Sequence, residues 1–385
     1  MEKIKVLQVN KLYYPEVGGI EKTLQQISEG LVHEAEVELK VLVCQKKGKY
    51  VEDHINGVEI HRAGSLGVIA SVPISISFLW TFRRMALNMD IVHLHLPFPL
   101  GDLACLLSGY KGKVVACWHS DVVKQKKWMI IYRPIMEHFL KRADLILVGA
   151  QGVAKGSRYL GPYLDKCKVV PFAIENSVLE NSRKGLEERW QRKAKDKFKI
   201  LFVGRLVYYK GCSILIEAFA KMKEEAILTI LGDGPLKEEL EERCKKLGIA
   251  EKVVFAGFVS ETEKRRYFEQ ADVFVLPSVE RSEAFALVQL EAMAYGIPVI
   301  NTNLPSGVPE VSVHGKTGLT VKPGDIDGLA SAMEWMLENR ESRIRMGKEA
   351  RKRVEQEYTE EKMIGDLKKI YLELYGKKCN IRRKN

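Results

Sequence analysis

The sequence lacks the features that mark membrane-spanning and exported proteins. No stretch reaches 18 apolar residues without a charge, and the nearest one, Leu66–Trp80, is broken by Pro73 and several serines. It is too short and too polar to cross a bilayer. The N-terminus runs directly into a strand-like segment and shows no signal-peptide core. We therefore expect a soluble protein.

Cysteines are few and show no pairing pattern. The seven cysteines are odd in number, and no two of them form a CxxC pair. This usage is typical of free thiols in a reducing cytoplasm, and it argues against disulfides or a thiolate zinc site. The expected location is the cytoplasm.

Composition excludes collagen, coiled coil and long disorder. The chain is 46% hydrophobic and 29% charged, with 30 glycines and 13 prolines, which are ordinary values for a globular protein. Its 385 residues are enough for two domains, each able to bury its own core.

Positive charge is in excess and clustered. The 61 Lys and Arg outnumber the 50 Asp and Glu, giving a formal net charge of +11. Residues 111–144 and 183–199 each carry a local excess of five, and residues 377–385 hold five basic residues and no acid. Such clusters indicate either an anionic partner or solvated faces. Nucleic acid is the least favoured anion, because no zinc finger, RRM or basic-zipper signature is present.

Short apolar runs alternate with amphipathic stretches, which predicts α/β domains with parallel sheets. The expected strands are Ile4–Asn10, Val37–Val43, Ile91–His95, Val114–Cys117, Leu145–Val148 and Val169–Pro171, then Ile200–Val203, Ala226–Leu231, Val253–Phe255, Val273–Leu276, Val299–Ile300 and Gly318–Val321. The pattern divides the chain into a first domain (1–174), a charged linker with a helix (175–197), a second domain (198–357) and a C-terminal helix with a basic tail (358–385). Ligands bind beyond the carboxyl ends of such strands, so functional residues are expected in the strand-to-helix loops.

The strongest motif is a pair of carboxylates. Glu283 lies just before an expected helix and Glu291 about two turns inside it. A fully helical span would separate them by roughly 12 Å, which is too far for the acid and base of a glycosidase. The spacing suits an elongated ligand whose phosphates bind the free amides of residues 286–288. A capping Glu and a surface Glu are the structural alternative.

Two glycine-containing loops offer phosphate contacts. Arg205 and Lys210 follow an expected strand, and two fixed positive charges would neutralise a diphosphate leaving group without a metal. Gly18 and Gly19 lie between the first strand and the first helix, where the backbone can close on a phosphate or an acceptor. Ordinary turns with exposed bases remain the alternative for both loops.

The remaining candidates are three histidines and two incomplete nucleotide-binding motifs. His119 follows a strand and suits a hydrogen bond to a sugar hydroxyl, although a structural role is the alternative. His93 and His95 alternate along one strand, but without a nearby third ligand we expect packing or site lining instead of metal binding. Lys237 replaces the third glycine of a dinucleotide fingerprint, and Glu310 replaces the first glycine of a P-loop, so neither class is supported.

Together and in this order, the motifs resemble those of the family-4 retaining glycosyltransferases, which have the GT-B fold. The similarity covers nearly the whole chain through GGIE, WHSD, GRL…KG, LGDGP, the E-x7-E pair and TGLTVKPGD. Finer features, such as VNKLYYPEVGGIEKTLQQI and SVERSEAFALVQLEAMA, are similar to bacterial O-antigen and capsule mannosyltransferases. The resemblance implies two Rossmann-like domains facing across a cleft, the first binding the acceptor and the second the nucleotide sugar, with the C-terminal helix returning to the first.

The resemblance also implies roles for individual residues. Glu283 would contact the transferred sugar, Glu291 the ribose, and His119 a hydroxyl of the donor sugar. Arg205 and Lys210 would hold the diphosphate. The remaining nucleotide-sugar contacts would come from Gly18, Gly19, Gly257, Phe258, Ala286, Leu287 and Val288. One departure is Glu283-Ala-Phe-Ala286 where the family commonly has E-G-F-G; alanine disfavours glycine-only angles, so a differently shaped loop is expected, without loss of activity.

The implied reaction is front-face transfer with retention, without a metal or other cofactor. GDP-mannose is the favoured donor and a UDP-sugar the alternative; the acceptor is a saccharide, polyprenyl-diphosphate-linked in O-antigen assembly. The basic and aromatic segment Lys124–Arg133 suits either an anionic inner-membrane surface or an ordinary surface helix. A sugar-nucleotide epimerase and a non-catalytic nucleotide-sugar-binding or membrane-scaffold protein are the competing functions.

Overall fold

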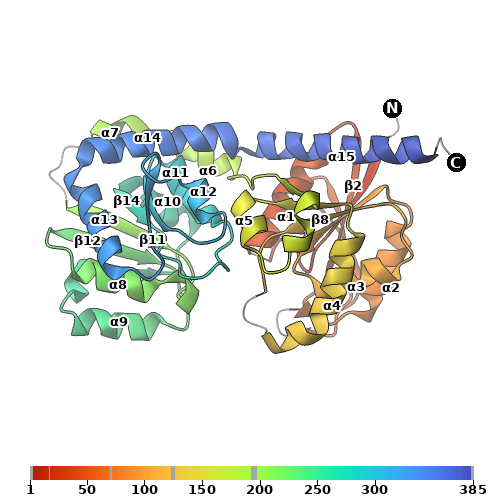
Figure 1. Cartoon of the computed structure of the whole chain (residues 1–385), viewed down its shortest axis with the longest axis horizontal. Coiled ribbons are helices and arrows are strands. Elements are labelled where there is room, and N and C mark those ends of the chain that lie inside the picture. Colours follow the sequence, from red (N-terminus) through yellow and green to blue (C-terminus); the bar gives the residue numbers. More distant parts are fainter. Residues whose placement is uncertain (1–2, 17, 70–71, 123–125, 192–196, 383–385) are drawn as a thin grey trace. The chain divides into compact units, whose positions relative to one another are not determined.

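The computed structural model describes residues 3–16, 18–69, 72–122, 126–191 and 197–382, and the chain divides into two compact units (Figure 1). Unit 1 comprises Met1–Ala173 together with Glu360–Asn385, and unit 2 comprises Ile174–Thr359. Each unit is built around a mainly parallel sheet, as the sequence predicts. None of the helices in the described part of the chain combines the length and the apolar character needed to span a bilayer.

An eight-stranded sheet forms the centre of unit 1. Its order is β10-β9-β8-β7-β1-β2-β4-β3, and only β3 and β4 pair antiparallel. These strands are β1 (Ile4–Val9), β2 (Val37–Cys44), β3 (Val51–Ile55), β4 (Val58–Ala63), β7 (Ile91–Leu96), β8 (Lys113–Trp118), β9 (Leu145–Val148) and β10 (Cys167–Val169). All residues of the central strand β7 are buried, as expected for a strand with both faces covered. A separate two-stranded ribbon joins β5 (Val68–Ile69) and β6 (Val72–Pro73).

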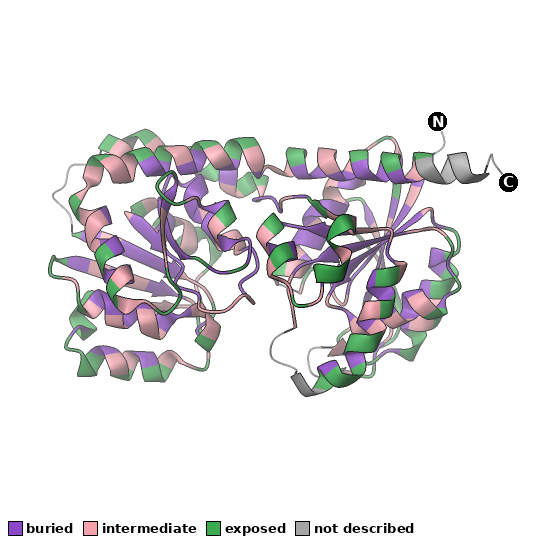
Figure 2. Cartoon of the chain, viewed as in Figure 1, coloured by how far each residue is buried: buried purple, intermediate pink, exposed green. Residues whose placement is uncertain are grey.

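Helices cover this sheet. They are α1 (Gly19–Leu31), α2 (Ile76–Ala86), α3 (Pro99–Leu107), α4 (Lys126–Arg142), α5 (Gln151–Gly156), the 3-10 helix η1 (Gly161–Lys166) and α15 (Glu360–Arg382). Figure 2 shows that the strands are mostly buried, while the helices turn exposed residues outward.

The last helix, α15, belongs to unit 1 although it ends the described chain. It packs against α1, where Gly30 permits a close approach: a Cβ at this position would lie 2.5 Å from Ile364 Cγ1. Lys368 Nζ pairs with Glu34 Oε2 at 2.6 Å, and Tyr371 is fully buried. The prediction that the C-terminal helix returns to the first domain is therefore confirmed.

Unit 2 has a six-stranded, fully parallel sheet in the order β13-β12-β11-β14-β15-β16. Its strands are β11 (Phe198–Val203), β12 (Ala226–Leu231), β13 (Val253–Gly257), β14 (Val273–Val275), β15 (Val299–Thr302) and β16 (Gly318–Val321). Its helices are α6 (Asn176–Asn181), α7 (Leu186–Gln191), α8 (Cys212–Ala220), α9 (Lys237–Lys246), α10 (Glu261–Gln270), α11 (Leu287–Ala294), α12 (Val308–Val311), α13 (Ile326–Glu338) and α14 (Arg340–Glu357), with 3-10 turns η2 (Tyr208–Lys210) and η3 (Ala250–Lys252). The core between sheet and helices is apolar and includes Phe202, Leu215 and Met333.

The β3–β4 hairpin and the β5–β6 ribbon were not predicted. β3 is largely exposed, and β4 is mostly buried but interrupts its apolar residues with Glu59, His61 and Arg62, so neither strand has a clear apolar pattern. The signal that could have found the hairpin is Asn56-Gly57, whose φ angles of 50° and 83° form the turn. The segment expected to be a linker contains α6 and α7, and both helices lie in unit 2.

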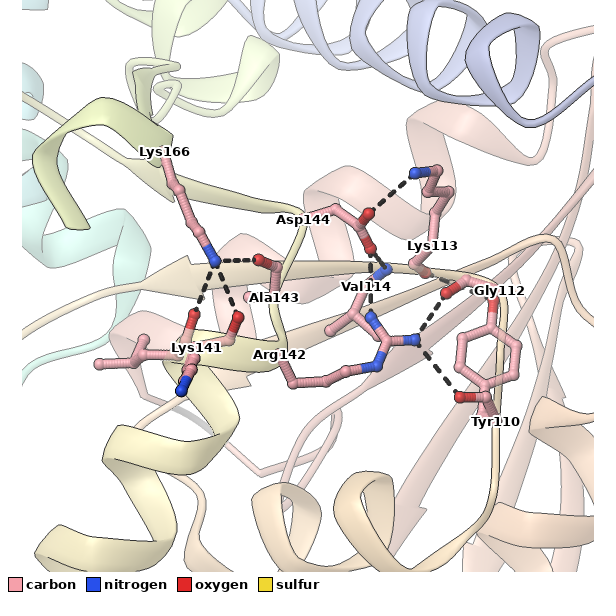
Figure 3. Close-up of polar contacts among 10 residues, drawn as sticks. Tyr110, Gly112, Lys113, Val114, Lys141, Arg142, Ala143, Asp144 and Lys166 are labelled. Carbon is pink, nitrogen blue, oxygen red and sulfur yellow. Dashed lines mark hydrogen bonds and ion pairs between the residues drawn. The ribbon is translucent and has the colours of Figure 1, made fainter. Parts of the chain in front are cut away.

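Two of the eight basic residues in 111–144, Lys113 and Arg142, and Lys166 further along the chain stabilise the fold of unit 1 (Figure 3). Asp144 pairs with Lys113 Nζ at 2.8 Å and with Arg142 at 3.2 Å, at the amino ends of β8 and β9. Lys166 Nζ donates to the carbonyl oxygens of Lys141 and Ala143, at the end of α4, each at 2.8 Å. These cations are therefore paired inside unit 1. Parts of the other two basic clusters, residues 192–196 and 383–385, lie outside the described residues.

The α1–α15 contact predicts opposite effects for two helical glycines. Gly30→Ala should lower the free energy of unfolding of unit 1 by about 1–2 kcal/mol, because the added methyl overlaps buried Ile364. Gly365→Ala is the matched control: no atom lies within 4 Å of the position that its methyl would take, so the better helix propensity of alanine should stabilise by about 0.5–1 kcal/mol. Urea denaturation of the two variants measures both effects, and a stabilising Gly30→Ala would contradict the tight contact.

Candidate functional site

In unit 2 the candidate residues gather at one edge of the sheet. The loops after β11, β12, β13 and β14 contain the GRL…KG, LGDGP, Gly257-Phe258 and Glu283 motifs. Because these four strands are parallel neighbours, all four loops leave the same edge. The topology thus brings together motifs that lie far apart in the sequence.

The backbones of these loops touch where glycine is found. A Cβ on Gly211 would lie 2.0 Å from the carbonyl oxygen of Pro277, and a Cβ on Gly232 would lie 2.0 Å from that of Gly204. Both glycines also have positive φ angles, 71° and 126°. No other residue fits this arrangement without moving the neighbouring loop.

Lys210 and Glu283 form a buried ion pair. Their Nζ and Oε2 atoms are 2.5 Å apart, and their side chains are only 12% and 8% exposed. Ser278 Oγ donates a second hydrogen bond to the same carboxylate at 3.0 Å. Burial alone would lower the pKa of Lys210, but the charge of Glu283, its hydrogen bond with Lys210 and the neighbouring Tyr209 together outweigh burial, and the pKa is raised. Lys210 is therefore a permanent cation at the start of α8, and Glu283 a carboxylate held by two donors.

Ala286 adopts the conformation that glycine would supply. Its φ and ψ are 60° and 72°, in the left-handed region, immediately before the first residue of α11. Ala286 reaches these angles at a cost in strain, and the expectation of a differently shaped loop stays a prediction. The following amides of Leu287 and Val288 lie in the first turn of α11, where a helix has no internal acceptor for them.

The remaining candidates of unit 2 lie along the same edge. Glu291 is on α11 about one turn from its start, closer than the predicted two turns, and pairs with Lys264 Nζ at 3.0 Å. Burial lowers the pKa of Lys264, but Glu291 outweighs this effect and raises it. Arg205 is exposed, and Phe258 presents 91% of its side chain to solvent just after Gly257, whose φ is 69°.

In unit 1, Gly18 and Gly19 begin α1, after β1. Gly18 is the extended residue before the helix, and a Cβ there would lie 2.2 Å from Glu21 Oε2. Gly19 has open space around its Cβ position. The Glu21 carboxylate thus lies against Gly18, only Gly19 is open, and a phosphate or acceptor contact at this loop stays a prediction.

His119 lies just after β8 and is joined to other buried histidines. Its Nε2 is 2.9 Å from His95 Nδ1, and its ring stacks on Phe172 with centroids 4.9 Å apart. His93 and His95 also stack, with centroids 4.9 Å apart. The pKa of His119 is lowered well below its usual value, first by burial and then by the charges of His95 and Lys11. The ring is therefore neutral.

The expectation that His95 lacks nearby metal-ligating groups was wrong. Strand pairing places Cys117 beside His95, and the ligand atoms of His95, Cys117 and His119 lie within 4.8 Å of one another. Sequence spacing could not show this, because β7 and β8 are separated by α3. In the observed arrangement, however, both ring nitrogens of His95 are used by Gln8 and His119, and burial raises the pKa of the Cys117 thiol. These groups are arranged as a hydrogen-bonded cluster, with a protonated thiol.

Several residues of these sites were missed by the sequence analysis. Lys264 and Ser278 hold the two carboxylates of unit 2, and Gln8 and Tyr371 contact the histidines of unit 1. Ser278 opens the quoted segment SVERSEAFALVQLEAMA but was given no role there, whereas Gln8, Lys264 and Tyr371 lie outside the motifs and reach their partners through tertiary packing. The position of Gln8, a polar residue inside an apolar strand, is the one signal available in the sequence.

Comparison with known proteins identifies the family. The family described as "Glycosyltransferase Family 4" matches residues 17–176, and "Glycosyl transferases group 1" matches residues 186–353. The chain is 31% identical to "O-antigen chain mannosyltransferase C" of Escherichia coli, over 97% of this chain and 100% of the relative. It is 32% identical to "D-rhamnosyltransferase WbpZ" of Pseudomonas aeruginosa, over 92% of each chain. The chain therefore belongs to the family-4 glycosyltransferases, and it is an enzyme of that class.

Solved structures agree on the fold. Sucrose-phosphate synthase from Thermosynechococcus elongatus superposes with a TM-score of 0.79 at 20% identity, covering 97% of this chain and 100% of that one. Anabaena HepE in complex with UDP gives a TM-score of 0.74 at 18% identity, covering 95% and 99%. The predicted GT-B fold with two Rossmann-like domains is confirmed.

The Lys210–Glu283 pair predicts strong energetic coupling. Lys210→Met and Glu283→Gln should each lower the free energy of unfolding of unit 2 by about 3 kcal/mol, because each leaves a buried partner without compensation. The double variant should lose clearly less free energy of unfolding than the two single variants lose in sum. Urea denaturation of all four proteins gives the coupling energy, and additive losses would contradict an energetically coupled pair. Lys245→Met, which breaks an exposed pair with Glu242, is the control and should leave stability unchanged.

Ala286→Gly should stabilise unit 2. The left-handed conformation costs alanine roughly 1–2 kcal/mol, which glycine would not pay. Glycine also has more freedom in the unfolded chain, and this reduces the gain in stability by about 0.4–1 kcal/mol. We expect a net gain of about 0.5–1 kcal/mol in the free energy of unfolding. Ala284→Gly, at a buried position without a positive φ, is the control and should destabilise. Equal losses in both variants would rule out strain at Ala286.

Proposed function

We propose that this family-4 glycosyltransferase transfers mannose from GDP-mannose, with retention, to a saccharide acceptor in O-antigen biosynthesis. The names of the two relatives, an O-antigen mannosyltransferase and a D-rhamnosyltransferase, support a hexose or deoxyhexose donor of this kind. The observation that carries the proposal is the buried Lys210–Glu283 pair beside the start of α11. It places a permanent cation and a fixed carboxylate next to helix amides that have no acceptor within the helix.

These groups match the charges that develop when a glycosyl diphosphate reacts. Lys210, exposed Arg205 and the amides of Leu287 and Val288 would hold the diphosphate and stabilise its growing negative charge as the glycosidic bond breaks. Glu283 would contact the transferred sugar and Glu291 the ribose. In front-face transfer, an oxygen of the leaving diphosphate takes the proton of the acceptor hydroxyl, so no covalent carboxylate intermediate forms. We propose that this reaction needs no metal.

An apolar groove in unit 1 supports a lipid-linked acceptor. It has a volume of about 450 Å³ and lies between the β5–β6 ribbon, the loop after β7 and α4. Its lining includes Ile69, Trp128 and Ile131, which are 57%, 58% and 67% exposed, together with Lys11 as its cation. Lys11 is also close enough to His119 to lower its pKa. A polyprenyl diphosphate combines an apolar chain with a charged head in the same way.

The same surface suits contact with an anionic membrane. Trp128, Ile130 and Ile131 are exposed on α4, and Ile130 reaches 79%. Exposed aromatic and aliphatic side chains beside basic residues are typical of interfacial helices. Within the basic segment named above, Lys124 lies outside the described residues. We therefore propose peripheral attachment to the inner face of the cytoplasmic membrane through this helix.

Donor turnover tests the reaction. Purified protein with EDTA should release GDP from GDP-mannose and not UDP from UDP-glucose, UDP-galactose or UDP-N-acetylglucosamine, and NMR should show a retained anomeric configuration in the product. Glu283→Gln should lower the rate at least about 100-fold, while Glu338→Gln, at an exposed position of α13, should not. An inverted product, a trapped glycosyl-enzyme or conversion of the donor to its epimer would overturn the mechanism.

Flotation with liposomes tests the apolar surface. The double variant Trp128→Ser/Ile131→Ser should lower the partition coefficient onto anionic vesicles at least about tenfold, because two large side chains can no longer insert. Leu107→Ser, which removes a 63% exposed leucine elsewhere in unit 1, is the control. Failure of the wild-type protein to float with anionic vesicles at low salt would end the proposal.

A further inference from the structure

A chain of buried polar side chains in unit 1 ends at His119. It runs from Tyr371 on α15 through Gln8 on β1 and His95 on β7. Gln8, His95 and Tyr371 are fully buried, and His119 is 8% exposed. The register of β1, β7 and β8 fixes the spacing, because Gln8 is paired with His93 and His95 with Cys117. The proposed reaction uses only the last member of this chain.

The Gln8 side chain sets the direction of the hydrogen bonds. Its Nε2 donates to Tyr371 Oη at 2.9 Å, and the tyrosine hydroxyl, 2.6 Å from His93 Nδ1, donates onward to that nitrogen. The other end of the amide, Oε1, lies 3.0 Å from His95 Nε2. An amide oxygen only accepts, so His95 carries its proton on Nε2.

This assignment determines the protonation of His119. A neutral imidazole with a proton on Nε2 has a bare Nδ1, and His95 Nδ1 faces His119 Nε2 at 2.9 Å. His119 must therefore donate from Nε2, which leaves its own Nδ1 as an acceptor. Burial lowers the pKa of His95 to about 3, and the pKa of His119 also lies well below its usual value, so neither ring becomes a cation near neutral pH.

We propose that Gln8 and His95, anchored by Tyr371, are positioning residues that hold His119 as the Nε2–H tautomer, so that its Nδ1 accepts a hydrogen bond from a substrate hydroxyl. This inference rests on the proposed glycosyl transfer for the identity of the hydroxyl. The hydrogen-bond chain itself depends only on unit 1. The stacked rings of Phe172 and His95 on His119 restrict its rotation, so the direction of Nδ1 is fixed as well as its protonation.

The tautomer is tested by NMR on the full-length protein. Long-range ¹H–¹⁵N spectra of histidine-labelled protein, assigned with His95→Asn and His119→Asn variants, should show His95 and His119 protonated on Nε2 and bare on Nδ1 at pH 7. A proton on His119 Nδ1 would mean that the chain runs in the reverse direction and would overturn the proposal. A stoichiometric metal in the purified protein would also overturn it, because both His95 and His119 would then need bare nitrogens facing the metal.

Substitutions test whether Gln8 and His95 orient His119 or only stabilise the fold. His95→Leu and Gln8→Leu should lower kcat at least about tenfold while the donor KM changes less than about threefold. A misaligned His119 Nδ1 weakens its hydrogen bond mainly in the transition state. His95→Asn places a carbonyl oxygen near the Nδ1 position and should recover most of the loss. If His95→Leu and His95→Asn are equally impaired, or both unimpaired, positioning through Nδ1 is wrong. Tyr110→Phe is the control, because it removes another buried hydroxyl, bonded to the Lys113 carbonyl, and should not change kcat.

The two proposals fail in different ways. If the wild-type protein transfers no sugar from any nucleotide donor, the proposed function fails, and the NMR spectra still decide the tautomer. If it is active but the tautomer of His119 is reversed, the positioning chain fails and the glycosyl transfer stands. Calorimetric unfolding of each variant shows whether a lost rate reflects a lost fold.

Discussion

A buried charge must have a partner, and the Lys210–Glu283 pair meets this requirement at the point where the loops of unit 2 converge. Lys210 and Ser278 both donate to the Glu283 carboxylate in a nearly closed environment, so this buried group is paired instead of isolated. That contact in turn fixes the loop between β14 and α11. The left-handed Ala286, the amides that open α11 and the position of Glu291 all follow from where this loop ends. One electrostatic constraint thus shapes the sheet edge at which we propose that the diphosphate binds.

The histidine cluster of unit 1 meets the same physical requirement with neutral groups. His93, His95 and His119 are uncharged, and their polar atoms are paired with an amide, a hydroxyl and one another. The arrangement is not complete, because His93 Nε2 has no partner among the described residues. An unpaired buried nitrogen costs about 1–3 kcal/mol, and such a cost is more easily explained in a functional cluster than in an ordinary core.

The sequence was most informative where the chemistry is local. Both sheets, nearly all their parallel strands and the loops with Glu283, Lys210 and His119 follow from apolar periodicity and short motifs. Pairings across the fold could not be predicted in this way. Gln8 and Tyr371 are 363 residues apart, and Lys264 reaches Glu291 from another helix. The β3–β4 hairpin was missed because neither of its strands has a clear apolar pattern, although Asn56-Gly57 marks its turn. Ala286 shows another limit: its left-handed conformation could not be read from the sequence, because alanine gives no signal for a positive φ.

The return of α15 to unit 1 has a consequence for how the protein is made. On the ribosome, the first 173 residues emerge without the helix that covers Gly30 and supplies Tyr371, and the 186 residues of unit 2 must be translated before it appears. At about 5–20 residues per second this delay lasts roughly 10–40 s. During that time the α1 surface that α15 covers is exposed, and the histidine cluster lacks the hydroxyl of Tyr371. Any truncated product that lacks the last helix would have an incomplete histidine chain. It would also expose the apolar α1 surface, by which cellular quality control can recognise it.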